Sequence, residues 1–143
     1  MIRNLGAFVI GVVTAFVTVM LVDKIGHMVY PPPPGLDFTN PDAIRPYLAT
    51  LPIGAFLFIL ASSVVAAFVG TFIACCIGTA NPKIFGSVVG GIVFAASVAK
   101  FIAIPHPLWL SLATLSGIIL STVFAMRLAT ATTGRDSSDG DPG

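Results

Sequence analysis

Residues 5–22 read LGAFVIGVVTAFVTVMLV, a run of apolar and small side chains without a single charge. A helix needs about 20 mainly apolar residues to cross the hydrocarbon core of a bilayer. Three further runs of this kind lie at residues 52–77, 84–104 and 108–127. The runs are continuous rather than alternating, so a transmembrane barrel is excluded. The sequence therefore predicts an all-α fold, an integral membrane bundle of four transmembrane helices.

Helix-breaking residues separate the runs where boundaries are needed. They lie at residues 31–35, at 78–82, and at Pro105 with Pro107. The connections between the last three runs are so short that neighbouring helices must be antiparallel. The first helix can continue past its apolar run until the prolines that begin at Pro31. Its length and the lack of a small-residue cleavage site distinguish it from a cleaved signal peptide.

Composition supports the same fold class. Hydrophobic residues make up 56% of the chain and charged residues 9%, against roughly 25% charged in soluble domains. The formal net charge is +1, so no basic patch favours a nucleic-acid partner. Residues 1–128 are predicted to form the transmembrane domain. Residues 129–143, rich in Gly, Ser and Asp, are predicted to be a disordered cytoplasmic tail.

Small residues recur at intervals of four in every run, and such spacing allows helices to approach closely in lipid. These series contain Gly11, Gly70, Gly91 and Gly117. In the third run the series is Ser87, Gly91, Ala95 and Ala99, with Gly86 and Gly90 on an adjacent row. Two interpretations follow. The small residues pack the four helices against one another, or one series faces a second copy and makes an oligomer.

Polar residues gather at the end of the bundle that holds the loop between the first two helices. The candidate cluster consists of Asp23, His27, Tyr30, Asp37, Asp42, Arg45, Lys100, His106 and Trp109. Asn40 is a suitable N-cap for a short helix in this loop, with Pro41 at its first position. We expect residues 30–52 to form an ordered cap over residues 104–109, with the proline run beside Trp109.

Several interpretations compete for these side chains. Lys100 lies near a helix end, where it can extend its ammonium to the headgroups or pair with a carboxylate. A substrate or proton role is the alternative, because ionisable groups within a span are often functional. The histidines are expected to hydrogen-bond to loop carbonyls, and Trp109, Tyr30 and Tyr47 to form an interfacial aromatic belt. No metal motif has diagnostic spacing, so neither a metal nor a cofactor is predicted.

Lysine and arginine positions indicate the orientation. Four of these residues lie on the side of the termini, against three on the side of the loop. The first group is Arg3, Lys83, Arg127 and Arg135, and the second is Lys24, Arg45 and Lys100. The difference favours both termini in the cytoplasm and a periplasmic loop.

Three segments carry a family resemblance: HMVYPPPPGLD at residues 27–37, LATLPIGAFLF at 48–58 and IPHPLW at 104–109. Together they resemble a family of small, uncharacterised four-helix proteins of the bacterial inner membrane, over roughly residues 5–128. The resemblance implies this fold and location, and it implies no catalytic activity. Lys100 departs from the polar uncharged residue that the resemblance leads us to expect there.

Three functions are compatible with these features. The leading hypothesis is a non-enzymatic structural or accessory protein that packs with itself or with a membrane partner. The first alternative is a small oligomeric channel or transporter, although the middle of each span lacks ionisable residues. The second is an enzyme at the membrane interface with His27 or His106 as base. No hydrolase elbow, phosphate loop or HExxH motif supports catalysis.

Overall fold

The structure, a computed structural model, describes residues 2–78, 81–104 and 106–135. These residues form five helices: α1 (Ile2–Val29), α2 (Pro41–Thr50), α3 (Ile53–Ile77), α4 (Pro82–Ala103) and α5 (Leu108–Arg135). Four of them, all except the short α2, are long and apolar enough to cross a membrane. The predicted all-α fold with four transmembrane helices is confirmed, and the chain is a multi-pass membrane protein.

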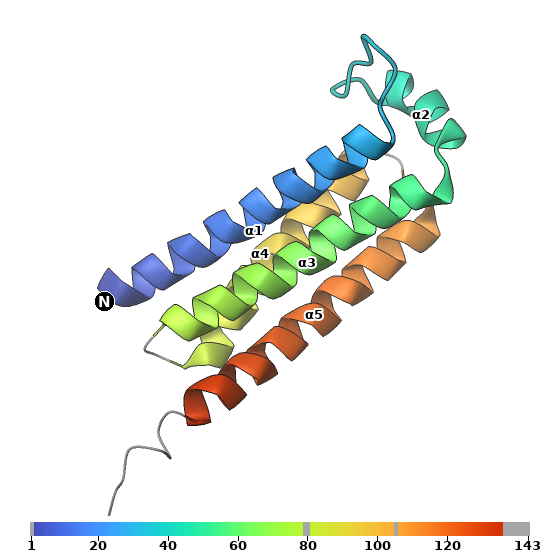
Figure 1. The fold of residues 1–143 in the computed structure, drawn as a ribbon. Coiled ribbons are helices and arrows are strands. Elements are labelled where there is room, and N and C mark those ends of the chain that lie inside the picture. The colour runs from blue at the N-terminus through green and yellow to red at the C-terminus, as the bar shows by residue number, and fades with distance from the viewer. Residues whose placement is uncertain (1, 79–80, 105, 136–143) are drawn as a thin grey trace, which may run out of the picture.

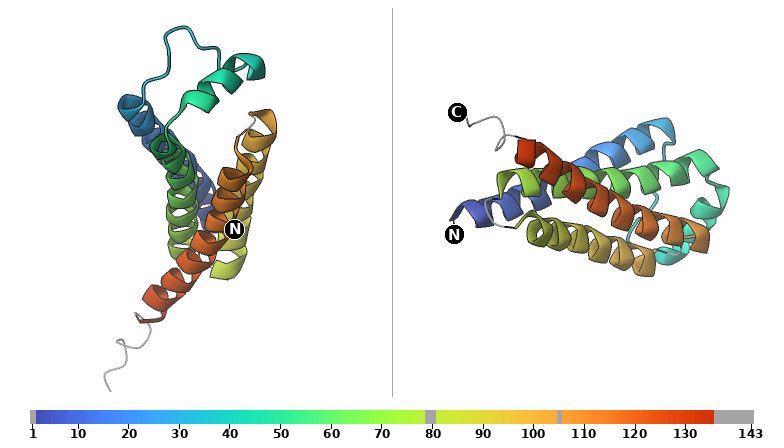
Figure 2. Two further views of the ribbon diagram at one scale, coloured as in Figure 1. Left: turned by 90° about the vertical axis from the view of Figure 1, so that its right-hand side faces the viewer. Right: turned by 90° about the horizontal axis from the view of Figure 1, so that it is seen from below.

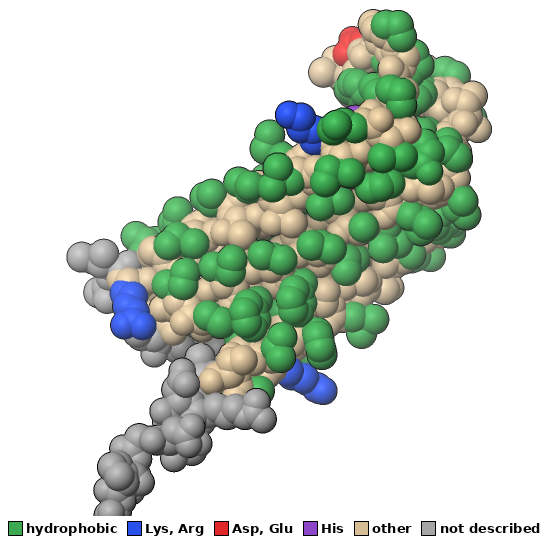
Figure 3. Space-filling view, viewed as in Figure 1, with side chains coloured by type: hydrophobic (Ala, Val, Ile, Leu, Met, Phe, Trp, Pro, Cys, Tyr) green, Lys and Arg blue, Asp and Glu red, His purple; other side chains and the backbone are tan. Residues whose placement is uncertain are grey.

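The four long helices lie side by side and alternate in direction along the chain (Figure 1). The start of α1 and the end of α5 lie at one end of the bundle, here called the termini end. The loop with α2 projects from the opposite end, the loop end (Figure 2). In the space-filling view, hydrophobic side chains cover the flank of the bundle, and Lys and Arg lie toward its ends (Figure 3). This distribution suits a bundle whose flank faces lipid.

Helix α3 occupies the centre and packs against α1, α4 and α5. Its contact with α1 is made by glycine and alanine on both helices. A Cβ placed on Gly70 would lie 2.7 Å from the Cβ of Ala15, and one on Gly11 would lie 2.7 Å from the Cβ of Ala74. Backbone therefore meets backbone here, which is how small residues stabilise helix pairs in lipid.

The other spans use glycine in the same way, with one exception. Gly117 of α5 faces Val64 of α3, and Gly86 and Gly90 of α4 face Met126 and Thr122 of α5. Gly91, in contrast, has nothing within 4 Å of the position its Cβ would take. The prediction that Gly91 packs within the bundle is wrong, because α4 turns the adjacent glycine row inward.

Helix α5 extends to Arg135, past its predicted end at residue 127. Residues 129–135 are helical, so the predicted disordered tail is wrong for this part. Threonine fits this extension, because Thr130 Oγ1 donates to the carbonyl of Arg127 at 2.8 Å and Thr132 Oγ1 to that of Ala129 at 2.9 Å. These bonds keep polar side chains satisfied on a continuing helix. Residues 136–143 lie outside the described residues.

The predicted short helix of the loop is confirmed as α2. Asn40 is its N-cap, and the Asn40 side-chain oxygen accepts a hydrogen bond from the backbone N–H of Asp42 at 3.0 Å. Pro41 supplies the first position, where a missing N–H costs nothing. Gly35 has a φ of +82°, which lets the chain turn back after the proline run. These local signals place α2 over the loop end of the bundle.

Candidate functional site

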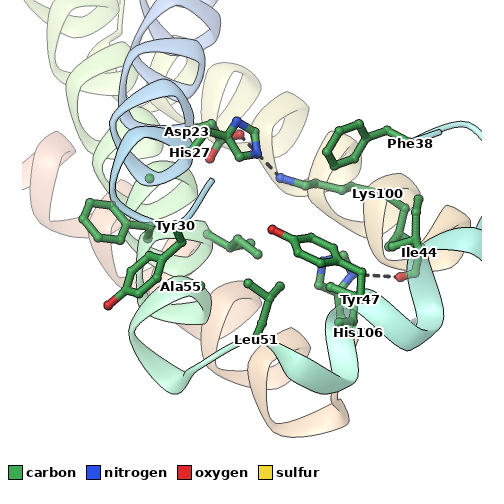
Figure 4. Close-up of a pocket in the computed structure, with 15 residues that line it drawn as sticks. Asp23, His27, Tyr30, Phe38, Ile44, Tyr47, Leu51, Ala55, Lys100 and His106 are labelled. Atoms are coloured by element: carbon green, nitrogen blue, oxygen red, sulfur yellow. Dashed lines mark hydrogen bonds and ion pairs between the residues drawn. The ribbon is translucent and has the colours of Figure 1, made fainter. Parts of the chain in front are cut away.

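A cavity of about 280 Å³ lies at the loop end, beneath α2 and between the ends of α1, α3 and α4 (Figure 4). Its walls combine apolar side chains with a few polar groups, as in most small-molecule sites. The lining residues are Asp23, Gly26, His27, Tyr30, Phe38, Ile44, Tyr47, Leu48, Leu51, Ala55, Phe58, Ile59, Lys100, Ile104 and His106.

An ion pair forms one wall of this cavity. Lys100 Nζ of α4 lies 3.6 Å from Asp23 Oδ2 of α1, and the two side chains are 34% and 27% exposed. Of the interpretations open for Lys100, the structure shows pairing with a carboxylate. The distance exceeds the roughly 2.7–2.9 Å of a tight charge-assisted hydrogen bond. The lysine ammonium has three donors, so it retains capacity for a further acceptor.

His106 lies in the turn between α4 and α5. Its Nδ1 is 2.8 Å from the carbonyl oxygen of Ile104. A carbonyl only accepts, so Nδ1 donates, and Nε2 of the neutral ring is left as an acceptor. Burial lowers the pKa of His106, and the charge of Lys100 lowers it further, while the bond to Ile104 acts in the opposite direction. His106 is therefore a neutral ring at the cavity wall near pH 7.

The rings of His27 and Tyr30 lie at the edge of the cavity, and each contacts a phenylalanine ring. The His27 ring lies 6.0 Å from that of Phe38, between centroids, and so connects α1 to the loop. The Tyr30 ring meets Phe58 edge-on at 6.1 Å, and its hydroxyl lies against Gly54, where no Cβ would fit. These contacts hold the end of α1 against the start of α3.

The structure brings only part of the predicted polar cluster together. Asp23, His27, Tyr30, Lys100 and His106 line the cavity, whereas Asp37, Asp42, Arg45 and Trp109 do not. Asp42 and Arg45 are exposed on α2.

Asp37 instead orders the loop itself. Its Oδ1 accepts bonds from the hydroxyl of Thr39 at 2.6 Å and from the Thr39 backbone N–H at 2.9 Å. Both bonds favour the charged carboxylate, so the pKa of Asp37 is lowered, chiefly by the hydroxyl. The residue therefore stabilises a turn and takes no part in the cavity.

The expected contact between the proline run and Trp109 is not what the structure shows. Trp109 packs edge-on against Phe56 of α3, with ring centroids 6.0 Å apart and an interplanar angle of 81°. Pro31, Pro33 and Pro34 are exposed. Trp109 thus has its aromatic partner on the neighbouring helix α3. The cap that covers the cavity is therefore α2, and Ile104 and His106 line the same cavity below it.

Sequence reasoning found only part of the apolar lining. It placed Ile44, Tyr47 and Leu48 on an apolar face of the short loop helix, but it did not single out Phe38, Leu51 or Phe58 for the site. The helical spacing of Ile44, Tyr47 and Leu48 does indicate an apolar face on α2. Ile44, 2% exposed, is the residue of that face buried most deeply.

A second, smaller cavity lies next to the first. This groove, of about 200 Å³, lies between α1 and α4 and borders on α3. Lys100 lines both spaces. The buried Ser63 and Ser97 form part of its wall, while Phe16 and Ala96 are exposed on the flank. The remaining lining residues are Ala15, Val19 and Val93. The groove therefore opens sideways, toward the region that lipid occupies.

Within the described residues, no group of three or more His, Cys, Asp or Glu side chains could hold a metal ion. Comparisons of the chain with models of protein families, with curated proteins and with solved structures give no match. The family resemblance of the loop and turn segments stays a prediction, and the function is argued below from the geometry.

Proposed function

We propose that this chain is a non-enzymatic accessory protein of the bacterial inner membrane that associates with a second copy of itself. The contact is the outward row of α4, which consists of Ser87, Gly91, Ala95 and Ala99. All four residues are exposed, and the Ser87 hydroxyl at one end of the row also donates to Met126 Sδ of α5 at 4.0 Å. A second copy is the favoured occupant because identical rows of small residues can approach each other equally closely.

The row on α4 carries the proposal because it differs from the rows on the other spans. Gly11, Gly70 and Gly117 each meet another helix of the same chain, and Gly91 meets none. Exposed Ile84 and Val88 flank the row, 60% and 45% exposed. Small residues with larger apolar neighbours make a shallow groove that a matching helix fills. This face is therefore complementary to itself.

Two features support a role without catalysis. Within the described residues, neither histidine hydrogen-bonds to a carboxylate, and His106 is bound to its own backbone. A base that is oriented by a carboxylate would need the first contact. Asp23, the carboxylate of the cavity, pairs instead with Lys100. The polar side chains of the cavity are therefore arranged to bind a ligand rather than to transfer a proton.

Self-association is tested by native mass spectrometry and by crosslinking in nanodiscs. A Cβ at Gly91 has no atom within 4 Å, so Gly91→Leu should fill the outward row, leave the fold intact and abolish the dimer. Gly6→Leu is the matched control, because Gly6 also has nothing within 4 Å of its Cβ position. A monomeric parent protein contradicts the proposal, as does a dimer that survives Gly91→Leu. Co-purification of another membrane protein would replace the second copy as partner.

We propose in addition that both termini lie in the cytoplasm. The support is the sequence bias of lysine and arginine, together with the placement of Arg3 and Lys83 at the termini end of the bundle. Labelling of single introduced cysteines with a membrane-impermeant maleimide tests the orientation in intact spheroplasts. A cysteine at Thr39 should react and one at Thr130 should not. The opposite pattern would invert the topology.

A further inference from the structure

The cavity at the loop end and the groove between α1 and α4 are neighbours, since Lys100 lines both, and together they outline an elongated site. Along α1 the site reaches from Ala15 to His27, which corresponds to about 18 Å of helix axis at 1.5 Å per residue. One end is polar and near the membrane surface. The other is apolar and lies midway along the span. A site of this shape matches a molecule with a polar head and a long apolar chain.

The polar end is electrically balanced. Its two charged side chains are Lys100 and Asp23, of opposite sign and 3.6 Å apart. A purely anionic head would compete with Asp23 for the ammonium and leave a carboxylate without its partner, which is costly in a partly buried site. A head that carries both charges avoids this cost. The anionic oxygen of the head accepts hydrogen bonds from the Lys100 ammonium, and the ammonium of the head donates to the Asp23 carboxylate.

Other groups at this end favour a head with N–H donors. Neutral His106 keeps Nε2 as an acceptor after Nδ1 has donated to Ile104. A primary ammonium has three donors to distribute, whereas a trimethylated ammonium has none. The cavity, at about 280 Å³, has room for a head of this size beneath α2.

The sideways opening identifies the source of the molecule. Phe16 and Ala96 line the groove and are exposed on the flank of the bundle. Both helices are long and apolar enough to cross a membrane, so their flank faces lipid and the groove exchanges contents with the bilayer. Apolar walls of Val19 and Val93 suit a hydrocarbon chain and offer it few polar contacts. The ligand therefore enters from lipid, with its head already at interface depth.

We infer that the cavity and the groove together bind one aminophospholipid, with a zwitterionic primary-ammonium head between Asp23 and Lys100 and one acyl chain between α1 and α4. The cap helix α2 covers the head with Ile44 and Tyr47. No covalent step is involved. The site holds the lipid and so makes the protein responsive to this lipid class.

The test is native mass spectrometry of the full-length protein with added phosphatidylethanolamine, phosphatidylcholine or phosphatidylglycerol of identical acyl chains. We expect phosphatidylethanolamine to be retained about tenfold better than either other lipid, since each of them lacks the ammonium N–H donors. Lys100→Met and Asp23→Asn should each remove this preference. Lys24→Met and Asp42→Asn are the matched controls, because they remove like charges at the same end but outside the cavity, and they should retain it.

A second variant keeps the proposal testable if the ion pair proves necessary for folding. Ala96→Phe fills the groove and leaves both charges in place, so it should abolish lipid retention while circular dichroism shows an intact bundle. Ala113→Phe, at an exposed position of α5, is its control. Equal retention of all three lipids would overturn the inference, and so would unchanged retention in Ala96→Phe. Displacement of the lipid by chain-free glycerophosphoethanolamine would also overturn it, because binding would then rest on the head alone.

Discussion

Helix α1 has two neighbours and contacts them in opposite ways. Toward α3 it presents Gly11 and Ala15, which meet Gly70 and Ala74 with backbones in contact. Toward α4 it presents Phe16 and Val19, and a groove of about 200 Å³ remains between the two helices. We call the first contact the packed seam and the second the open side. Both are formed by one apolar helix within one bundle.

The difference shows that helix association in lipid depends on matched small residues on both partners. The packed seam has them on both helices. On the open side, larger side chains on α1 face Val93 and Ser97 of α4. At the loop end, the ion pair of Lys100 and Asp23 connects α1 to α4 across the length of a lysine side chain. The groove is therefore a consequence of side-chain size along these two faces.

The largest expected effect comes from breaking the packed seam. Gly70→Leu would place its Cβ 2.7 Å from that of Ala15 and 2.8 Å from the carbonyl oxygen of Gly11. Neither atom is the end of a flexible side chain, so the helices must separate, at a cost of about 3 kcal/mol or more. Unfolding in sodium dodecyl sulfate, followed by circular dichroism, measures this loss.

The control for the seam is the same type of substitution at an open glycine. Gly6→Leu adds an apolar side chain to α1 where nothing lies within 4 Å. It should leave the unfolding midpoint close to that of the parent protein. Comparable destabilisation by both substitutions would show that the contact at Gly70 does not determine how α1 packs.

A smaller effect is expected from the cap helix α2, which covers the cavity at the loop end. Ile44 is 2% exposed and is the only residue of α2 that is buried. Ile44→Ala should loosen α2 by about 2 kcal/mol without removing any span from the membrane. Limited proteolysis should then cleave the loop near Arg45 faster than in the parent. Ile53→Ala, at a position that is 70% exposed, should not change the cleavage rate, and an equal increase in both would contradict this assignment.

The smallest effect concerns pH and the cavity at the loop end. Burial lowers the pKa of His106 from its ordinary value, which is about 6.5. The unfolded chain therefore takes up this proton first, so the contribution of His106 to stability is complete above about pH 6.5. That contribution declines as the pH falls from there through the lower pKa of the folded protein.

Thermal unfolding at about pH 7.5 and about pH 5.5, on either side of the ordinary value, measures this contribution. The parent should lose more stability on acidification than His106→Gln, which keeps a donor for the Ile104 carbonyl but does not titrate. Identical losses in the two proteins would assign the pH dependence to other groups.

Much of the fold follows directly from the sequence. Continuous apolar runs determine the spans, and Asn40 with Pro41 determines where α2 begins. Both features act locally, so the pattern alone is sufficient. The end of α5 was less predictable, because Thr130 and Thr132 look polar in sequence but satisfy their hydroxyls on the helix.

The site was only partly predictable, for a geometric reason. A spacing of four identifies a face of a helix but does not say which neighbour that face meets. Gly90 and Gly91 occupy adjacent rows of α4, and only the structure shows that Gly90 faces Thr122. The same ambiguity applies to Lys100, whose partner could have been any of several carboxylates at the loop end. A groove is harder still to predict, because it forms where two neighbouring helices do not pack closely, and the sequence of neither helix shows this.

One mechanical consequence follows from the contacts of α1. The helix touches α3 along most of its length, from Gly11 near the termini end to Gly26 against Phe58 and Tyr30 against Gly54 at the loop end. Because α1 is held along one face in this way, it cannot tilt without losing some of those contacts. It can, however, rotate about its line of contact with α3. The groove can therefore widen or narrow by this rotation of α1. Such a rotation moves Phe16 and Asp23 relative to α4, while Gly11 stays against Ala74.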